Sequence, residues 1–404
     1  MTLHTMEYPN LIGVTESETL AMTRRAAEID SPDHPVISLS AGEPDFPTPA
    51  YVAEAGIAAI RAGRTRYPPA AGLAALRGAI ASYLEESCGG DWTPDQVIVS
   101  VGAKQALFDA IFTLFGPGDQ VAIPAPYWVS YPPMVRLARA EPVILPTRRE
   151  DGFRPLPEQV EDAFEEGARG LILNSPGNPT GAMLTEADVA ALVDLAATHD
   201  AWIISDEIYN EIRYVDGFAS VAPHARDYER IVLVNGFSKA FSMTGWRVGY
   251  AAAPVELVKA MTRLQGHINT NTALPAQHAA LAALTEKDAR RAAISSMVEA
   301  FARRRTMLLE GLGRIPGLDA FPPLGAFYIW VDAGAWCRAA GMTSAELCFD
   351  LLDHERLALV PGAAFGGEEY VRISFAASDE ALAGALQRLG AAADRLGILA
   401  GQET

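Results

Sequence analysis

Short apolar segments alternate with longer amphipathic ones along the first two thirds of this 404-residue chain. The apolar runs are rich in branched side chains, which is typical of strands buried on both faces. These predicted strands cover residues 96–100, 120–123, 142–145, 170–173, 202–205, 231–234 and 247–252. Helical spacing between them is clearest at residues 104–115 and 185–199. Such alternation favours an α/β fold, with a mainly parallel sheet covered by helices.

The last third of the chain has a different pattern. A long, charged helical stretch at residues 290–312 precedes shorter strand-like and helical segments. The predicted strands are 327–331, 357–360 and 370–375, and the predicted helices are 344–354 and 379–396. This order indicates a second, smaller α+β domain. The strand-like run at 36–39 has no partner nearby, so we expect a large domain at 47–290 and a small one built from 1–46 and 291–404.

Charge and cysteine content exclude several classes of protein. With 32 basic and 50 acidic residues the net charge is −18, which argues against an extended nucleic-acid surface or an anionic membrane partner. No secretory signal or membrane-spanning apolar run is recognisable. Cys88, Cys337 and Cys348 are too few and too scattered for a disulfide framework or a zinc site. We therefore expect reduced thiols, a cytoplasmic location and no structural metal.

Lys239 is one of only four lysines and follows the predicted strand 231–234. Ligands of open α/β sheets bind at the carboxyl ends of strands. Phe237, Phe241 and Trp246 surround this lysine in sequence, and partial desolvation would favour its neutral amine. A neutral amine can attack a carbonyl and form a Schiff base. The alternative is a surface lysine that extends past apolar neighbours.

Acidic and amide side chains follow two other predicted strands. Asp206 and Tyr209 come directly after strand 202–205. A carboxylate there can hold a heteroaromatic nitrogen protonated, although an N-cap for the following turn is the simpler alternative. Asn178 lies in a loop rich in proline, glycine and asparagine at 174–181, which could be a stiff donor platform or a plain chain reversal.

Three more features indicate binding of an anion and of a planar ring. Gly102-Ala103-Lys104 opens a helix, whose exposed N–H groups suit a phosphate. Neither a Walker loop nor a Gly-x-Gly-x-x-Gly fingerprint occurs, so a nucleotide has little support. Trp128 could stack on a planar ring or pack in the core. Arg372 interrupts an apolar strand, where a guanidinium suits bidentate capture of a carboxylate.

Together these motifs resemble the fold-type-I, pyridoxal-phosphate-dependent aminotransferases of class I/II, in the aspartate aminotransferase-like group. The resemblance extends from about Ile37 to the final helix. Eight motifs carry it, at residues 41–46, 66–68, 101–108, 126–131, 174–181, 205–209, 238–247 and 370–375. It implies a large domain with a mainly parallel seven-stranded sheet sandwiched by helices, plus a smaller α+β domain.

The resemblance also implies roles for the residues around the cofactor ring. Lys239 matches the lysine that holds pyridoxal phosphate as a Schiff base and later moves a proton. Asp206 matches the partner of the pyridine nitrogen. Tyr209 and Asn178 match the groups that bond the phenolic oxygen, and Trp128 matches the aromatic residue stacked on the ring.

For the phosphate, the resemblance implies a cradle of backbone amides and cationic side chains, completed by a tyrosine of the other subunit. The set is Gly102, Ala103, Lys104, Ser238, Arg247 and, from the partner, Tyr67. A homodimer with shared active sites follows from this resemblance.

Substrate recognition is implied for a further overlapping set of residues. Arg372 matches the clamp for the α-carboxylate, with Gly42 contributing a backbone N–H and Trp128 and Asn178 flanking the substrate. Lys104 stands where similar enzymes engage the distal carboxylate of acidic substrates, although it could instead face solvent or phosphate. Glu18 departs from the pattern of those enzymes, and its charge would repel a substrate dianion.

The implied activity is transamination by two half-reactions (a ping-pong mechanism), from an L-amino acid to a 2-oxo acid. Aspartate, glutamate and aromatic or prephenate-type compounds are the expected substrates. A pyridoxal-phosphate β-lyase would use the same lysine and scaffold, so it remains an alternative. A non-catalytic regulator would need a DNA-binding module, for which the short N-terminal segment leaves no room.

Overall fold

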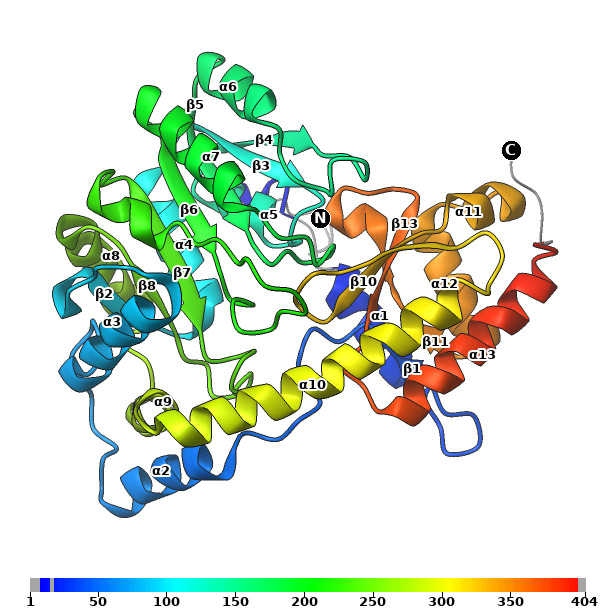
Figure 1. The fold of residues 1–404 in the computed structure, drawn as a ribbon, viewed down its shortest axis with the longest axis horizontal. Coiled ribbons are helices and arrows are strands. Elements are labelled where there is room, and N and C mark those ends of the chain that lie inside the picture. Colours follow the sequence, from blue (N-terminus) through cyan, green and yellow to red (C-terminus); the bar gives the residue numbers. More distant parts are fainter. Residues whose placement is uncertain (1–7, 15–17, 399–404) are drawn as a thin grey trace.

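The computed structural model of the chain describes residues 8–14 and 18–398. Its centre is a seven-stranded sheet in the order β2-β8-β7-β6-β5-β3-β4 (Figure 1). The strands are β2 (Val97–Ser100), β3 (Gln120–Ala125), β4 (Glu141–Pro146), β5 (Ala168–Asn174), β6 (Trp202–Asp206), β7 (Ile231–Gly236) and β8 (Gly249–Ala252). Strand β8 is antiparallel to both neighbours, and the other pairs are parallel. The predicted mainly parallel α/β sheet is confirmed.

Helices cover both faces of this sheet. Side chains alternate along each strand, so Ile231 and Leu233 belong to one buried cluster and Val232 and Val234 to another. The first cluster lies against helices α3 (Ala74–Cys88), α6 (Pro157–Glu165), α7 (Glu186–Thr198) and α9 (Leu274–Thr285). The second lies against α4 (Gly102–Leu114), α5 (Tyr131–Leu137) and α8 (Val255–Ile268). Burial on both faces explains why the strands are continuously apolar.

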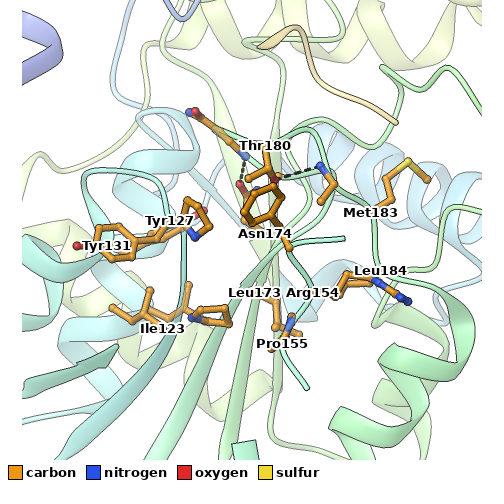
Figure 2. Close-up of a pocket in the computed structure, with 17 residues that line it drawn as sticks. Ile123, Tyr127, Tyr131, Arg154, Pro155, Leu173, Asn174, Thr180, Met183 and Leu184 are labelled. Carbon is orange, nitrogen blue, oxygen red and sulfur yellow. Dashed lines mark hydrogen bonds between the residues drawn. The ribbon is translucent and has the colours of Figure 1, made fainter. Parts of the chain in front are cut away.

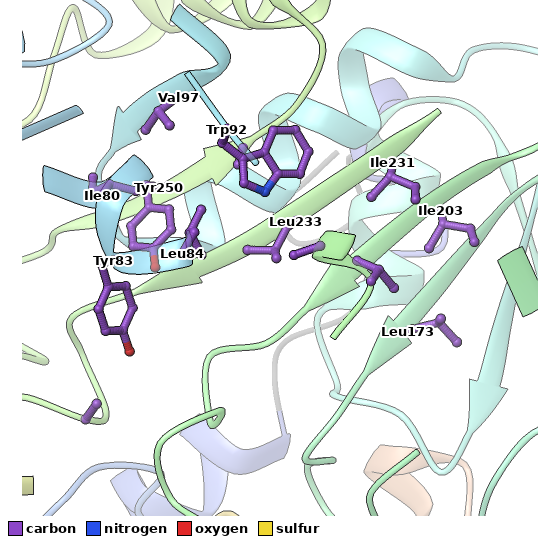
Figure 3. Close-up of a cluster of buried hydrophobic side chains, with 14 of the residues drawn as sticks. Ile80, Tyr83, Leu84, Trp92, Val97, Leu173, Ile203, Ile231, Leu233 and Tyr250 are labelled. Atoms are coloured by element: carbon purple, nitrogen blue, oxygen red, sulfur yellow. The ribbon is translucent and has the colours of Figure 1, made fainter. Parts of the chain in front are cut away.

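Figure 3 shows the first cluster at the edge of the sheet nearest α3. Ile80 and Leu84 of α3 approach the sheet there, close to Tyr250 of β8 and Leu233 of β7. All four side chains are at most 1% exposed. The close fit fixes the ends of β7 and β8, from which the Lys239 loop departs.

A second unit is built around the four-stranded antiparallel sheet β12-β13-β10-β9. Its strands are β9 (Asp319–Phe321), β10 (Tyr328–Asp332), β12 (Val360–Pro361) and β13 (Tyr370–Ser374). The surrounding helices are α1 (Glu18–Ile29), α10 (Lys287–Leu312), α11 (Gly334–Ala340), α12 (Ser344–Glu355) and α13 (Asp379–Arg395). Strand β1 (Ile37–Ser38) pairs in parallel with β11 (Leu357–Ala358), so the isolated N-terminal strand lies beside the C-terminal third. The boundaries at 47 and 290 stay predictions.

Several sequence predictions need correction. The run 357–360 is two strands, because Leu357 pairs with β1 whereas Val360 pairs with Arg372 of β13. Strand β9 was not predicted, and neither were helices α1, α2 (Ala50–Arg61), α3, α5, α6, α8, α9 and α11. Short 3-10 helices occur at Pro9–Leu11, Pro94–Gln96, Ala222–Arg226 and Gly362–Phe365. Across residues 8–14 and 18–398, no helix is long and apolar enough to cross a membrane.

Candidate active site

A cavity of about 600 Å³ opens where the carboxyl ends of the central strands face the second sheet. Its size is typical of a site for a small-molecule ligand. Most of the predicted site residues line it: Gly42, Ala103, Lys104, Trp128, Asn178, Asp206, Tyr209, Ser238, Lys239, Arg247 and Arg372. Gly102 lies at its edge, where an added Cβ would be 2.6 Å from Arg247 Nη2. Tyr67 does not line the cavity, and it is 88% exposed.

Lys239 extends from the loop after β7 toward the N-terminal segment. Its Nζ donates a hydrogen bond to the carbonyl oxygen of Gly42 and lies 5.6 Å from the ring centroid of Phe327. Burial and the neighbouring positive charge of Arg372 lower the pKa of Lys239 to about 8, while Glu43 opposes the shift. The amine is therefore far closer to its neutral, nucleophilic form than an ordinary lysine.

Asp206 ends β6 and is 4% exposed. Its Oδ2 accepts a hydrogen bond from the Tyr131 hydroxyl at 2.8 Å, and its Oδ1 accepts one from the Ile208 N–H at 3.2 Å. Burial raises the pKa of Asp206 to about 6, while these two bonds and the charge of Lys239 hold it down. The carboxylate is ionised near neutral pH and can pair with a protonated ring nitrogen.

The loop bearing Asn178 is fixed by Asn174, the last residue of β5. The Asn174 side chain donates to the carbonyl oxygen of Asp206 and accepts from the Asn178 N–H, both at 2.8 Å. Figure 2 shows this loop from a small adjoining cavity of about 40 Å³, with Tyr131 on one side and Thr180 above Asn174. Thr180 Oγ1 accepts from the Ala182 N–H at 3.2 Å. These hydrogen bonds favour the stiff platform over a plain chain reversal.

Arg372 on β13 is a cation with neutral partners only. It is 2% exposed, donates to Asn178 Oδ1 at 3.1 Å and to the Ser40 carbonyl oxygen at 2.7 Å. Its Cζ lies 4.4 Å from the ring centroid of Tyr328. Within the described part of the chain no carboxylate pairs with it, and its Nε has no hydrogen-bond partner. A buried guanidinium in this state is well suited to an anionic ligand such as a carboxylate.

The start of α4 forms an anion-binding corner. Gly102 has φ +78°, and a Cβ on Gly249 would lie 2.2 Å from the Ala103 nitrogen, so glycines allow this close approach. Arg247 is held by a hydrogen bond from Nη1 to the Thr244 carbonyl oxygen at 2.9 Å. Lys104 Nζ lies 4.8 Å from the ring centroid of Trp128, and burial and then Arg247 lower its pKa. A helix N-terminus beside two cations fits a phosphate group.

Some cavity residues were not singled out from the sequence. Tyr328 on β10 shares a 2.8 Å hydrogen bond with the Tyr209 hydroxyl, and Tyr131 holds Asp206. A tyrosine in an apolar strand resembles an ordinary core residue, so only the motif at 126–131 pointed to Tyr131. Thr19, Thr23 and Glu43 also line the cavity. Only the backbone of Glu18 is described, so the repulsion predicted for its side chain stays a prediction.

One cavity holds a lysine, a buried carboxylate, an anion-binding corner and a guanidinium with neutral partners. This combination fits pyridoxal phosphate with an amino acid. Comparison with known proteins agrees. Residues 34–389 match the family "Aminotransferase class I and II", and the chain belongs to this family. The chain is a pyridoxal-phosphate-dependent amino acid transaminase of the aspartate aminotransferase type.

Individual relatives resemble the chain over most of its length. A bifunctional aspartate aminotransferase and glutamate/aspartate-prephenate aminotransferase of Petunia hybrida is 43% identical, covering 94% of this chain and 81% of that protein. The aspartate aminotransferase of Bacillus subtilis is 40% identical, and the match covers 93% of this chain and 96% of that protein. The solved structure of the Thermus thermophilus aspartate aminotransferase with maleate has a TM-score of 0.91 at 40% identity, covering 96% and 99% of the two chains.

Proposed function

We propose that this transaminase uses aspartate or glutamate as amino donor, with 2-oxoglutarate or oxaloacetate as acceptor, and also accepts aromatic or prephenate-type compounds. The observation that carries the proposal is the pair of cations, Arg372 and Lys104, in the cavity that holds Lys239. Two cations suit a substrate with two carboxylates. Relatives named for aspartate and prephenate transamination support the same choice.

Within this proposal each residue has a distinct task. When bound, pyridoxal phosphate supplies an aldehyde that takes up the amino group and a ring that withdraws electrons from the substrate. Lys239 Nζ holds the cofactor and then removes and returns the substrate proton, which its pKa of about 8 favours. Asp206 pairs with the ring nitrogen, and Tyr209 and Asn178 bond the phenolic oxygen.

The remaining roles concern the outer parts of the cofactor and substrate. Trp128 stacks on the ring, and the N–H of Gly42 assists Arg372 with the α-carboxylate. The phosphate is bound by Gly102, Ala103, Lys104, Ser238 and Arg247. The positive charge and the backbone N–H groups at the start of α4 support this assignment of the phosphate site.

We further propose a homodimer in which Tyr67 of each subunit completes the partner's phosphate site. The 88% exposure of Tyr67 supports this, as do the exposed Ile57 and Ile60 on α2. Residues 47–290 would form the cofactor-binding domain, and 1–46 with 291–404 the small domain. Their largely separate hydrophobic clusters support this division, with Ile208, Tyr209 and Ile212 of the larger domain packing into the cluster of the smaller one. The reduced thiols of Cys88 and Cys337 support a reducing compartment such as the cytoplasm.

The deciding experiment is a half-reaction screen of the cofactor-loaded protein. Each amino acid is mixed with it in turn, and loss of the visible absorbance with release of the matching 2-oxo acid identifies the donor. Borohydride should fix the cofactor to Lys239, and Lys239→Ala should abolish turnover. Lys259→Ala, on the surface beside Glu256, is the matched control. Pyruvate and ammonia formed without an added oxo acid would instead establish a β-lyase.

A further inference from the structure

The segment 40–46 has no regular secondary structure, and its residues Ala41, Gly42 and Glu43 form one wall of the active-site cavity. Three of its residues contact active-site side chains. The Ser40 carbonyl oxygen accepts from Arg372 at 2.7 Å, and the Gly42 carbonyl oxygen accepts from Lys239. Glu43 Oε2 accepts from Thr244 Oγ1 at 2.8 Å. The position of this irregular segment therefore sets the geometry around both Arg372 and Lys239.

A fourth contact anchors the same segment from outside the cavity. Arg304 on α10 donates from Nη1 and Nη2 to the two oxygens of Asp45, at 2.8 and 2.9 Å. Its Nε donates to Asp379 Oδ1, at the start of α13, also at 2.8 Å. Arg304 is 9% exposed, and the side chain of Asp45 is 26% exposed, whereas that of Asp379 is 63% exposed. The bidentate, better shielded bond to Asp45 is thus the stronger of the two.

A row of aromatic side chains connects Arg304 to the surroundings of Lys239. The guanidinium lies 5.3 Å from the ring centroid of Phe46, which packs edge-on against Phe301 at 5.5 Å. Phe301 in turn contacts Phe327 at 5.4 Å, and Phe327 lies below Lys239. Helix α10 runs along the molecule from α9 to α13 (Figure 1), so Arg304 joins the cavity wall to the longest helix of the fold.

We propose that Arg304 is a positioning residue, which through Asp45 holds Gly42 and Ser40 in register with Lys239 and Arg372. The role of Gly42 toward substrate rests on the proposed function. Because Arg304 does not line the cavity, its substitution displaces the wall without removing any group that contacts substrate. Binding of every α-amino acid should weaken to a similar extent, whatever its side chain.

The test compares Asp45→Asn, Arg304→Lys and Arg304→Met with two controls, Arg303→Met and Asp379→Asn. Arg303 is the exposed neighbour on α10, and Asp379 is the weaker partner. Asp45→Asn and Arg304→Met should each raise KM for aspartate, glutamate and phenylalanine about tenfold, because each removes one charge-assisted pair. The value of kcat should change by less than about threefold. Arg304→Lys should recover part of this loss, and both controls should stay within about twofold of the parent.

Hydrogen exchange of the cofactor-free protein supplies a readout that does not depend on activity. Amides of residues 41–46 should exchange about tenfold faster in Asp45→Asn and Arg304→Met, with the central sheet unchanged. Faster exchange throughout the chain, or unchanged KM, would overturn the proposal. Absence of transamination by the parent protein would refute the proposed function alone. The hydrogen-exchange result would still show whether Arg304 holds the segment 40–46 in place.

Discussion

The Tyr131 hydroxyl donates a 2.8 Å hydrogen bond to Asp206 Oδ2, across the carboxyl ends of two central strands. Tyr131 follows β3 and Asp206 ends β6, so the contact joins segments 75 residues apart. Both side chains are buried, and burial alone would favour the protonated acid. The tyrosine therefore helps to keep the carboxylate ionised, as a partner of a protonated ring nitrogen must be.

Replacing Tyr131 by Phe should raise the pKa of Asp206 above its present value of about 6. A raised pKa leaves the carboxyl protonated over a wider range, so activity should fall most on the acidic side. We expect kcat/KM to drop about tenfold at pH 6.5 and less at pH 8.5. A roughly tenfold drop is the size of effect expected from losing one hydrogen bond to a charged group. The pH profile of kcat/KM measures this. An acidic limb that stays in place would contradict the role given to Tyr131.

Arg372→Ala should weaken all α-amino acids alike, because each carries the carboxylate that this guanidinium is proposed to bind. Loss of a bidentate, buried pair costs about 3 kcal/mol, so KM should rise roughly 100-fold for aspartate, glutamate and phenylalanine. Arg226→Ala, which breaks an exposed ion pair with Asp91, is the control. Steady-state kinetics with the three donors measures the effect. A loss confined to dicarboxylic donors would exclude the proposed clamp.

Lys104→Met should penalise dicarboxylic substrates only. Methionine keeps an apolar stem over Trp128 and removes the charge. We expect KM for aspartate and glutamate to rise about tenfold, the worth of one partly shielded ion pair, with phenylalanine nearly unchanged. The ratio of kcat/KM values for aspartate and phenylalanine measures the change. Equal losses in both substrate classes would instead indicate that Lys104 acts at the phosphate alone.

The sequence was most informative where one residue type at a strand end is tied to one kind of chemistry. Lys239 and Asp206 could be selected in this way, and Arg372 could be selected because it interrupts an apolar strand. The structure brings all three into one cavity. The central sheet was predictable because strands buried on both faces are continuously apolar. Tyr131 and Arg304 were not selected, because their importance arises from partners far away in the chain.

Short strands show the same limit of local pattern. Residues 357–360 form one apolar run, and nothing in that run indicates that Leu357 and Val360 belong to different sheets. Their pairing depends on β1 and β13, which are distant in sequence. Alanine-rich helices such as α9 were missed for a related reason, since their small side chains are buried on several sides and show no clear apolar stripe.

Asp109 on α4 should make stability depend on pH. It is fully buried, and Gln105 Nε2 donates to its Oδ1 at 2.6 Å, but its Oδ2 has no partner among the described residues. Burial, partly opposed by Gln105, raises its pKa from 3.8 to about 7. Between those values the folded state binds more protons than the unfolded state, so the free energy of unfolding falls as pH rises.

Asp109→Asn removes this penalty and should gain stability over the parent by at most about 4 kcal/mol between pH 4 and pH 8. Guanidinium unfolding at several pH values measures the difference, with Asp95→Asn, an exposed carboxylate, as control. A difference between Asp109→Asn and the parent that does not change with pH would show that Asp109 is already ionised in the folded protein.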